Sequence, residues 1–399
     1  MSTAECGLRG VEVVFLSWRD TRNPEGGGAE RYLEEIAAGL VSRGARVTVF
    51  SAAHAAAPAE EERDGIRFVR AGTKLTVYAR GAWALARGGL GRPAVVVDVQ
   101  NGMPFFARLV TRRPVIVLVH HVHREQWPVV YPGLMGRIGW WLESRLAPRV
   151  YRDCQYVVVS DATGSELACL GVTGPRVAVV HNGSDPAPLV TSARTPYPSV
   201  CVVGRLVPHK RVEHAIDAVT ELRREIPGLR LTVVGSGWWE ANLRAYVALR
   251  GAQDCVTFLG HVDDATRTRV YAESWVLALP SLKEGWGLVV GEAAVVGTPT
   301  VAYAEAGGTR ESIIDGITGL LAEDRDGFAR ALHRVLTDER LRASLSCAAA
   351  RDDVRHTWEQ TRTDFAHVVA EVLAGRRVSG PAPIAPLAVA PLAVQPVEP

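Results

Sequence analysis

Short apolar runs separated by amphipathic stretches organise the first half of the chain. The runs are almost continuously apolar, which is typical of parallel strands covered on both faces. After the first run, apolar residues recur at helical spacing from Ala29 to Val41, and Gly44 ends that predicted helix. A strand, a helix and another strand in this order predict a βαβ unit. The predicted strands are Val11–Ser17, Arg46–Ala52, Ala94–Gln100, Val115–His121, Tyr156–Asp161 and Val177–Gly183.

A second series of the same kind follows residues 184–199, which are rich in proline and serine and predict a linker. Its predicted strands are Val200–Leu206, Leu231–Gly237, Val256–Gly260, Trp275–Ser281 and Thr298–Ala304, and helical segments from Phe328 to Leu373 end the fold. Two such series predict an α/β protein of two Rossmann-like, doubly wound parallel-sheet domains that face a cleft.

The domain boundaries follow from this pattern. We expect an N-terminal domain at 1–186, a C-terminal domain at 187–357 and a C-terminal helix at 358–375, for which a return to the N-terminal domain is one option. Residues 376–399 repeat APLAV and carry many prolines, which predicts a disordered tail.

The segment SLKEGWGLVVGEAAVVG joins a predicted buried strand to a predicted helix. In an open parallel sheet, ligands bind beyond the carboxyl ends of the strands, and helix N-termini attract phosphate. Gly287 and the backbone of Leu288 and Val289 would face a phosphate. Glu284 could accept hydrogen bonds from sugar hydroxyls, and Glu292 from a ribose diol. The pattern matches the binding of a nucleotide-sugar. The alternative is that Glu284 and Glu292 are ordinary carboxylates at a helix start that complement the helix dipole.

A second motif places two cations at another strand end. In VVGRLVPHKRVEHAIDAV, Arg205 follows a strand and Lys210 comes five residues later, before a helix. Fixed cations at these positions could neutralise a diphosphate leaving group. Two solvated surface charges are the alternative for this stretch taken alone.

Composition narrows the class of protein. The net charge is +2, so bulk charge gives no argument for nucleic-acid binding. The six cysteines form no CxxC pair, which fits free thiols in a reducing cytoplasm. No segment approaches the length of a membrane span. We therefore expect a cytoplasmic enzyme without nucleic-acid partners.

These motifs together resemble the retaining glycosyltransferases of family 4, which have the GT-B architecture of two Rossmann-like domains. EGWGLVVGE resembles that family's E-x7-E motif, and GRLVPHK resembles its Arg/Lys diphosphate clamp. GGGAERYLEEIAAGLVSRGARVTVF resembles its first glycine-rich loop and helix, and GTPTVAYAEAGGTRESIIDGITGLL the block after the E-x7-E motif. The resemblance covers about residues 11 to 373. Trp286 stands where phenylalanine is common, and EAAV replaces the usual EAMA.

The resemblance implies roles at the matching positions. Arg205 and Lys210 would bind the diphosphate, Glu284 the donor sugar and Glu292 the ribose. Gly27 and Gly28 would let the first loop approach the donor, because a Cβ would collide there. His120, which ends a predicted strand, matches the family's active-site histidine. GT-B enzymes generally need no catalytic metal, so we expect no metal site and no cofactor, and the nucleotide-sugar is a substrate.

The acceptor is less well defined by the sequence. We expect Asp20, His121, Arg124, Glu125 and Trp127 to line its pocket. The predicted activity is transfer of a hexose from a nucleoside diphosphate sugar, UDP-sugar before GDP-mannose, to a hydroxyl of a small specialised metabolite such as an aminocyclitol glycoside in antibiotic biosynthesis. A phosphatidylinositol or cell-envelope glycan acceptor is an alternative.

Other classes of protein remain open at this point. A nucleotide-sugar epimerase of GT-B fold would need no acceptor. A glycosidase could use two carboxylates, but a phosphate clamp would then have no purpose. A non-catalytic sugar-binding protein would not need Arg205 and Lys210 at these positions.

One further helix combines tryptophan with arginine. LMGRIGWWLESRLAPRVYR places Trp140 and Trp141 among several arginines. The favoured interpretation is a helix with its aromatic side on the core and its arginines in water. Peripheral contact with an anionic membrane is the alternative.

Overall fold

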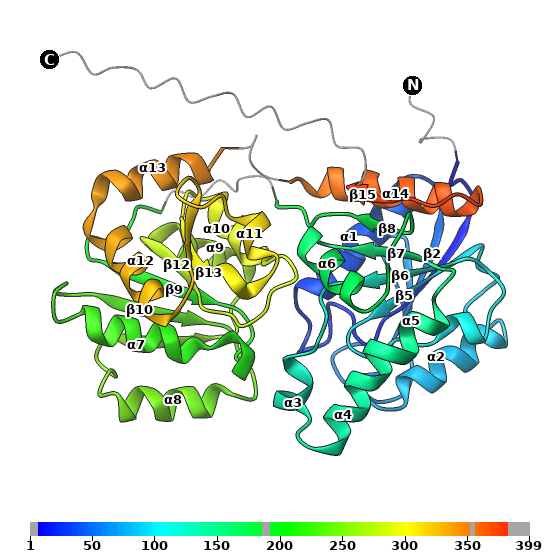
Figure 1. Ribbon diagram of the computed structural model, residues 1–399, viewed down its shortest axis with the longest axis horizontal. Coiled ribbons are helices and arrows are strands. Elements are labelled where there is room, and N and C mark those ends of the chain that lie inside the picture. The colour runs from blue at the N-terminus through cyan, green and yellow to red at the C-terminus, as the bar shows by residue number, and fades with distance from the viewer. Residues whose placement is uncertain (1–6, 186–191, 352–355, 382–399) are drawn as a thin grey trace, which may run out of the picture.

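The computed structural model describes residues 7–185, 192–351 and 356–381. The chain forms two α/β domains that lie side by side (Figure 1). Within the described residues, none of the helices combines the length and apolar character that a bilayer span requires.

The N-terminal domain is built on a nine-stranded sheet in the order β15-β8-β7-β6-β5-β1-β2-β4-β3. Every neighbouring pair is parallel except β3 and β4. The strands are β1 (Glu12–Leu16), β2 (Arg46–Ser51), β3 (Glu60–Arg63), β4 (Ile66–Arg70), β5 (Val95–Gln100), β6 (Val115–Val119), β7 (Gln155–Val158), β8 (Val177–Val179) and β15 (Gly380–Pro381).

Alternate residues of each central strand bury opposite faces of this sheet. Val13 and Phe15 of β1 point to one face, and Val14 and Leu16 to the other, so β1 has no polar side. The helices of this domain are α1 (Gly28–Ser42), α2 (Val77–Ala86), α3 (Gln126–Val130), α4 (Leu134–Trp141), a π-helical turn η2 (Leu142–Leu146), α5 (Ala147–Val150), α6 (Asp161–Cys169) and α14 (Trp358–Leu373).

The C-terminal domain is a six-stranded parallel sheet in the order β11-β10-β9-β12-β13-β14. Its strands are β9 (Ser199–Val203), β10 (Arg230–Val234), β11 (Val256–Gly260), β12 (Val276–Leu279), β13 (Thr300–Tyr303) and β14 (Gly319–Ala322). Its main helices are η3 (Pro208–Lys210, a 3-10 turn), α7 (Val212–Leu222), α8 (Glu240–Leu249), α9 (Asp264–Glu273), α10 (Leu288–Ala294), α11 (Thr309–Ser312), α12 (Arg325–Thr337) and α13 (Glu339–Ala349). Helices pack on both faces, so both sheets are doubly wound as expected.

Each sheet has one point at which the strand order reverses. It lies between β9 and β12 in the C-terminal domain and between β1 and β5 in the N-terminal domain. Because ligands of open α/β sheets bind beyond the carboxyl ends of the strands at such a point, a ligand site is expected at the two reversals.

The chain returns to the N-terminal domain at its end. Helix α14 packs along α1 (Figure 1), and Phe365 of α14 stacks on Phe15 with ring centroids 6.1 Å apart. The two helices approach so closely that a Cβ on Gly39 would lie 2.5 Å from the Cβ of Arg362.

The predicted start of the tail at residue 376 is too early. The Gln155 side chain donates a hydrogen bond to the Val378 carbonyl at 2.8 Å, and β15 (Gly380–Pro381) pairs with β8, so Val378 is held against β7 and the last two described residues extend the sheet. Residues 382–399 lie outside the described residues, as does the stretch 186–191 of the predicted linker.

The tryptophan–arginine helix differs in one respect from its favoured interpretation. Trp140 packs on the core and the arginines are exposed, but Trp141 is 54% exposed. The aromatic pair is therefore divided between the core and the solvent.

Candidate active site

An ion pair marks the strand reversal of the C-terminal domain. Lys210 ends the η3 turn that follows β9, and its Nζ lies 2.5 Å from Oε1 of Glu284, which follows β12. A backbone hydrogen bond of 2.8 Å from Leu282 N–H to the His209 carbonyl ties the two loops together. The next residue, Arg211, has φ of 48°, a left-handed conformation that ends the turn and begins α7.

Glu284 is held in its charged form. Burial alone would raise its pKa, but Lys210, through charge and a hydrogen bond, outweighs burial and lowers the pKa below its usual 4.5. The carboxylate is therefore ionised at neutral pH and carries a second oxygen that can accept hydrogen bonds.

Arg205 lies between the two domains. It lines a small hollow with Lys210, Leu279 and Ser281, and its Nε would lie 3.4 Å from a Cβ on Gly27 of the first loop. Gly28, the next residue of that loop, faces Leu288, because a Cβ there would lie 2.8 Å from the Leu288 Cδ1. The glycines predicted to permit close approach are thus placed against Arg205 and the start of α10.

Two charged residues beside this loop, Glu30 and Arg19, were not singled out from the sequence. Glu30 is buried, and its carboxylate accepts hydrogen bonds from Gly27 N–H at 2.7 Å and from Arg19 Nε at 3.2 Å. Burial would raise its pKa, but Arg19 and Arg205 together bring it below 4.5. The glutamate three residues into a helix after a glycine is a capping-box signal that could have identified it.

Glu292 lies farther along α10. It accepts a hydrogen bond from the Tyr271 hydroxyl at 2.9 Å and pairs with Arg267 at 3.4 Å and with Arg31 of the N-terminal domain at 3.5 Å. Val289, on the first turn of the same helix, is half-buried. Gly287, with φ of 88°, makes the turn that begins α10.

His120 lies where the domains meet. Its ring is buried with an edge toward Tyr32, at 5.3 Å between centroids, and Nε2 has no partner among the described residues. Burial lowers the pKa of His120 to about 4, so the imidazole is neutral at neutral pH. Its carbonyl oxygen would lie 2.3 Å from a Cβ on Gly285, which brings the loop containing Glu284 directly against the end of β6.

The residues expected to line the acceptor pocket have different surroundings. Asp20 is fully buried: its carboxylate accepts hydrogen bonds from Arg70 at 2.5 Å and Ser51 at 3.0 Å and contacts His54 at 3.2 Å. Hydrogen bonds from these partners hold Asp20, and with it the loop after β1, in place. The geometry therefore gives it a structural position in place of the expected acceptor contact.

Trp127 is also committed to packing. Its indole nitrogen donates to buried Glu143 at 2.6 Å, and its ring occupies space beside Gly139, where a Cβ would lie 2.2 Å away. His121 contacts Gln126 at 2.9 Å, whereas Arg124 and Glu125 are exposed.

Two further contacts connect the domains near the site. Lys283 forms an ion pair with Glu166 of α6, and the Glu311 carboxylate accepts hydrogen bonds from Asp161 N–H and Ala162 N–H at 2.8 Å each. Asp161, Glu311 and His181 also bring one ligand atom each within 4.8 Å of one another. Because Glu311 caps α6 in this arrangement, the group has a structural explanation without an ion.

The chain matches two family models. Residues 26–188 match the model described as Glycosyltransferase Family 4, and residues 190–352 match the model described as Glycosyl transferases group 1. Together the matches span both domains.

Known relatives include several sugar-transferring enzymes. The chain is 28% identical over 410 residues to glycogen synthase of Mycobacterium tuberculosis, covering 93% of this chain and 97% of the relative. It is 34% identical over 260 residues to D-inositol 3-phosphate glycosyltransferase of Stackebrandtia nassauensis, covering 58% of each. It is 34% identical over 189 residues to the GDP-mannose-dependent alpha-(1-6)-phosphatidylinositol monomannoside mannosyltransferase of Mycolicibacterium smegmatis, covering 45% of this chain and 48% of the relative.

Solved structures share the fold. Sucrose-phosphate synthase from Thermosynechococcus elongatus superposes with a TM-score of 0.78 at 20% identity, covering 92% of this chain and all of that chain. Anabaena HepE in complex with UDP and glucose superposes with a TM-score of 0.70 at 20% identity, with the same coverage. At this identity the likeness concerns the fold, which is GT-B.

Proposed function

Because the chain belongs to glycosyltransferase family 4, we propose that it transfers a hexose from UDP-hexose to an acceptor hydroxyl with retention of anomeric configuration. The observation that carries the proposal is the Lys210–Glu284 ion pair at the strand reversal, opposite His120 and the glycine-rich loop. A cation for the diphosphate and an ionised carboxylate for the sugar stand side by side there.

The proposed mechanism depends on positioning and charge. Arg205 and Lys210 neutralise the diphosphate as its bond to the anomeric carbon breaks, which lowers the barrier without a protein nucleophile. The departing diphosphate oxygen takes the proton of the attacking hydroxyl, which approaches the same face of the sugar. Neutral His120, whose Nε2 is free among the described residues, hydrogen-bonds the transferred sugar.

Glu292 is proposed to bind the ribose. Its carboxylate already contacts Tyr271, Arg31 and Arg267, but each oxygen has a further lone pair that can accept a hydrogen bond from a ribose hydroxyl. Arg31 comes from the N-terminal domain, so this contact would also connect nucleotide binding to the approach of the two domains.

UDP is proposed over GDP because the fold neighbour HepE is described with UDP and glucose. The acceptor proposed is a small polyol such as an aminocyclitol glycoside, supported by relatives named for inositol 3-phosphate glycosylation. A phosphatidylinositol-type or cell-envelope acceptor is the second candidate, supported by the relative named for a phosphatidylinositol mannoside.

The test is incubation of the purified chain with UDP- and GDP-hexoses, with and without polyol and phosphatidylinositol acceptors, and measurement of nucleotide release. We expect acceptor-dependent UDP release, abolished in Glu284→Gln and unchanged in Arg224→Gln, an exposed surface control. Conversion of the nucleotide-sugar without acceptor would identify an epimerase instead. The anomeric proton coupling of the product in NMR tests retention.

A further inference from the structure

One face of a single helical segment is exposed from end to end. Helix α4, the η2 turn and α5 form an unbroken helix over residues 134–150. Its outward positions recur every three or four residues, which places them in one stripe. The stripe consists of Leu134, Ile138, Trp141, Arg145 and Arg149. It is apolar in its first half and basic in its second half.

The apolar half of the stripe is not needed for packing. Leu134 is 68% exposed and Ile138 47%, and neighbouring Met135 is 59% exposed. The opposite side of the helix makes the packing contacts instead: Gly136 and Gly139 receive the backbone and ring of Trp127.

Neighbouring helices widen this surface. Helix α3 exposes Val129 and Val130, and α2 exposes Trp83. The loop before α2 reaches the α3–α4 loop, because Lys74 Nζ lies 5.6 Å from the Tyr131 ring centroid. Figure 1 places α3 and α4 at the lower edge of the N-terminal domain, with α2 beside α4 and α5 above it, and α14 at the opposite edge. Together these four helices and the η2 turn form what we call the docking face.

The docking face is strongly basic. Its helices carry four exposed arginines, Arg80, Arg137, Arg145 and Arg149, whereas their one acidic residue, Glu143, is buried. These helices therefore carry a net charge of +3, whereas the rest of the chain is close to neutral because the whole chain has a net charge of only +2. This asymmetry directs one face toward negatively charged surfaces.

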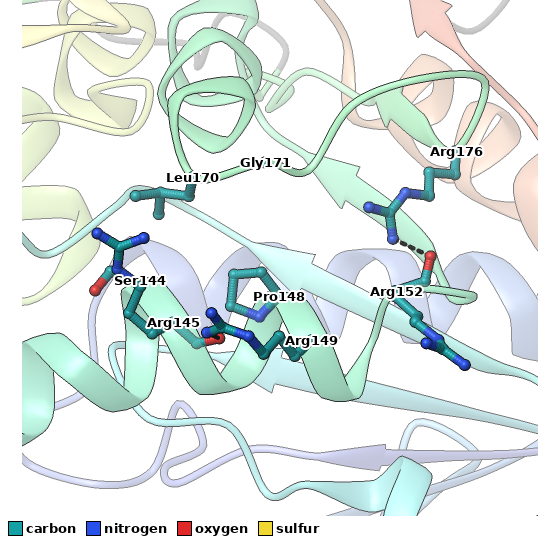
Figure 2. Close-up of a pocket in the computed structure, with 8 residues that line it drawn as sticks. All are labelled: Ser144, Arg145, Pro148, Arg149, Arg152, Leu170, Gly171 and Arg176. Atoms are coloured by element: carbon teal, nitrogen blue, oxygen red, sulfur yellow. Dashed lines mark hydrogen bonds between the residues drawn. The ribbon is translucent and has the colours of Figure 1, made fainter.

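The basic half of the stripe borders a hollow of about 510 Å³ (Figure 2). Arg145 and Arg149 line it from the helix, Arg152 from the turn after the helix, and Leu170 and Arg176 from the other side. Among the described residues, Arg145 and Arg149 pair with no carboxylate, and Arg149 donates only to the Arg145 carbonyl at 2.6 Å. The hollow therefore presents several guanidinium groups without carboxylate partners.

A structural explanation accounts for only half of this surface. Arginines near the end of a helix complement its dipole, which explains the basic half. The dipole gives no reason for the exposed aliphatic and aromatic side chains that continue the same stripe. Apolar and basic side chains on one face are the pattern of a helix that lies in a membrane interface.

We propose that the docking face binds the surface of a bilayer that contains anionic phospholipid. Ile138 and Trp141 enter the boundary between headgroups and acyl chains, and the arginine-lined hollow contacts lipid phosphates. Helix α3 also packs against the η3 turn, which contains Lys210, so the bilayer would lie near the opening of the active site. The inference does not depend on the proposed function, because its readout is binding.

The test is flotation of the full chain with phosphatidylcholine vesicles, with and without phosphatidylglycerol. We expect co-flotation only with phosphatidylglycerol, and release at high salt. Arg145→Gln/Arg149→Gln should weaken partitioning about thirtyfold, and Ile138→Ser/Trp141→Ser should reduce it at every salt concentration.

Matched controls make the result specific. Trp238→Ser/Leu249→Ser removes two apolar side chains of the C-terminal domain that are more exposed than Ile138 and Trp141, and should float like the wild type. Circular dichroism and thermal melting check that each variant is folded. The proposal would be overturned if the wild-type protein does not co-float with vesicles that contain phosphatidylglycerol, or if the control pair loses as much binding as Ile138→Ser/Trp141→Ser. Thermal stabilisation by inorganic phosphate without vesicle binding would assign the hollow to free phosphate and overturn it too.

Discussion

Replacing Gly285 with alanine should disable the site while leaving the protein folded, because this residue lies where the two domains meet. An added Cβ would lie 2.3 Å from the carbonyl oxygen of His120 and 3.1 Å from its carbonyl carbon. Both neighbours are backbone atoms at the end of β6, so no side chain can rotate away. The loop or the strand end must move instead.

The size of the effect follows from that overlap. Relieving it to an ordinary non-bonded separation requires a shift of about 1 Å. The shift moves Glu284, the preceding residue in the chain, relative to His120. A displacement of about 1 Å between reacting groups reduces turnover by about 100-fold, or about 2.7 kcal/mol in the activation free energy. The free energy of unfolding should fall by only about 1–3 kcal/mol, as for other overpacked sites.

The assay is UDP release with the best donor and acceptor, together with thermal melting. Gly164→Ala is the matched control: its Cβ would lie 3.7 Å from Val158 in ordinary contact, inside α6. It should keep full activity and be stabilised by about 0.5–1 kcal/mol. A Gly285→Ala variant with wild-type kcat/KM would refute the inferred contact between the loop and His120.

Two other predictions concern the protonation of His120 and the cap that Glu311 of the C-terminal domain places on α6 of the N-terminal domain. Burial lowers the pKa of His120 from 6.5 to about 4 in the folded chain. As the pH falls, the unfolded chain therefore takes up the proton at a higher pH than the folded chain does. Its contribution to the free energy of unfolding should be complete above pH 6.5 and be lost as the pH falls toward 4. His120→Asn should remove about 3 kcal/mol of this decline in urea titrations, and identical pH slopes would contradict the assignment. Glu311→Ala removes the acceptor of Asp161 N–H and Ala162 N–H, so we expect a loss of about 1 kcal/mol and faster hydrogen exchange at those amides, with Glu311→Gln as control. Unchanged exchange would show that the cap is unimportant.

The central strands were predictable because the apolar pattern that identifies each of them lies within a single short segment of the sequence. A run such as Val115–Val119 is apolar on both faces, and only a covered parallel strand uses such a run. The β3–β4 hairpin escaped prediction because Glu60–Arg63 is a charged edge strand with no apolar pattern. The error at Asp20 follows from the same omission, because its main partner, Arg70, ends the unpredicted β4.

The proximity of the candidate site residues was predictable as far as strand ends determine it. Arg205, Lys210 and Glu284 follow β9 and β12, which are neighbours in the sheet, so topology alone brings their loops together. The contacts of Gly285 with His120 and of Arg205 with Gly27 join residues of different domains. They depend on how the domains are oriented, which no local pattern records.

The central claim is that Arg205 and Lys210 bind the diphosphate of the donor, and titration calorimetry with UDP tests it most directly. Because each charge-assisted hydrogen bond contributes about 1.5–3 kcal/mol, Arg205→Ala and Lys210→Ala should each weaken UDP binding by about 10- to 100-fold, with Arg224→Ala unchanged. If both variants bind UDP as tightly as the wild-type chain, the diphosphate lies elsewhere and the proposed site is wrong.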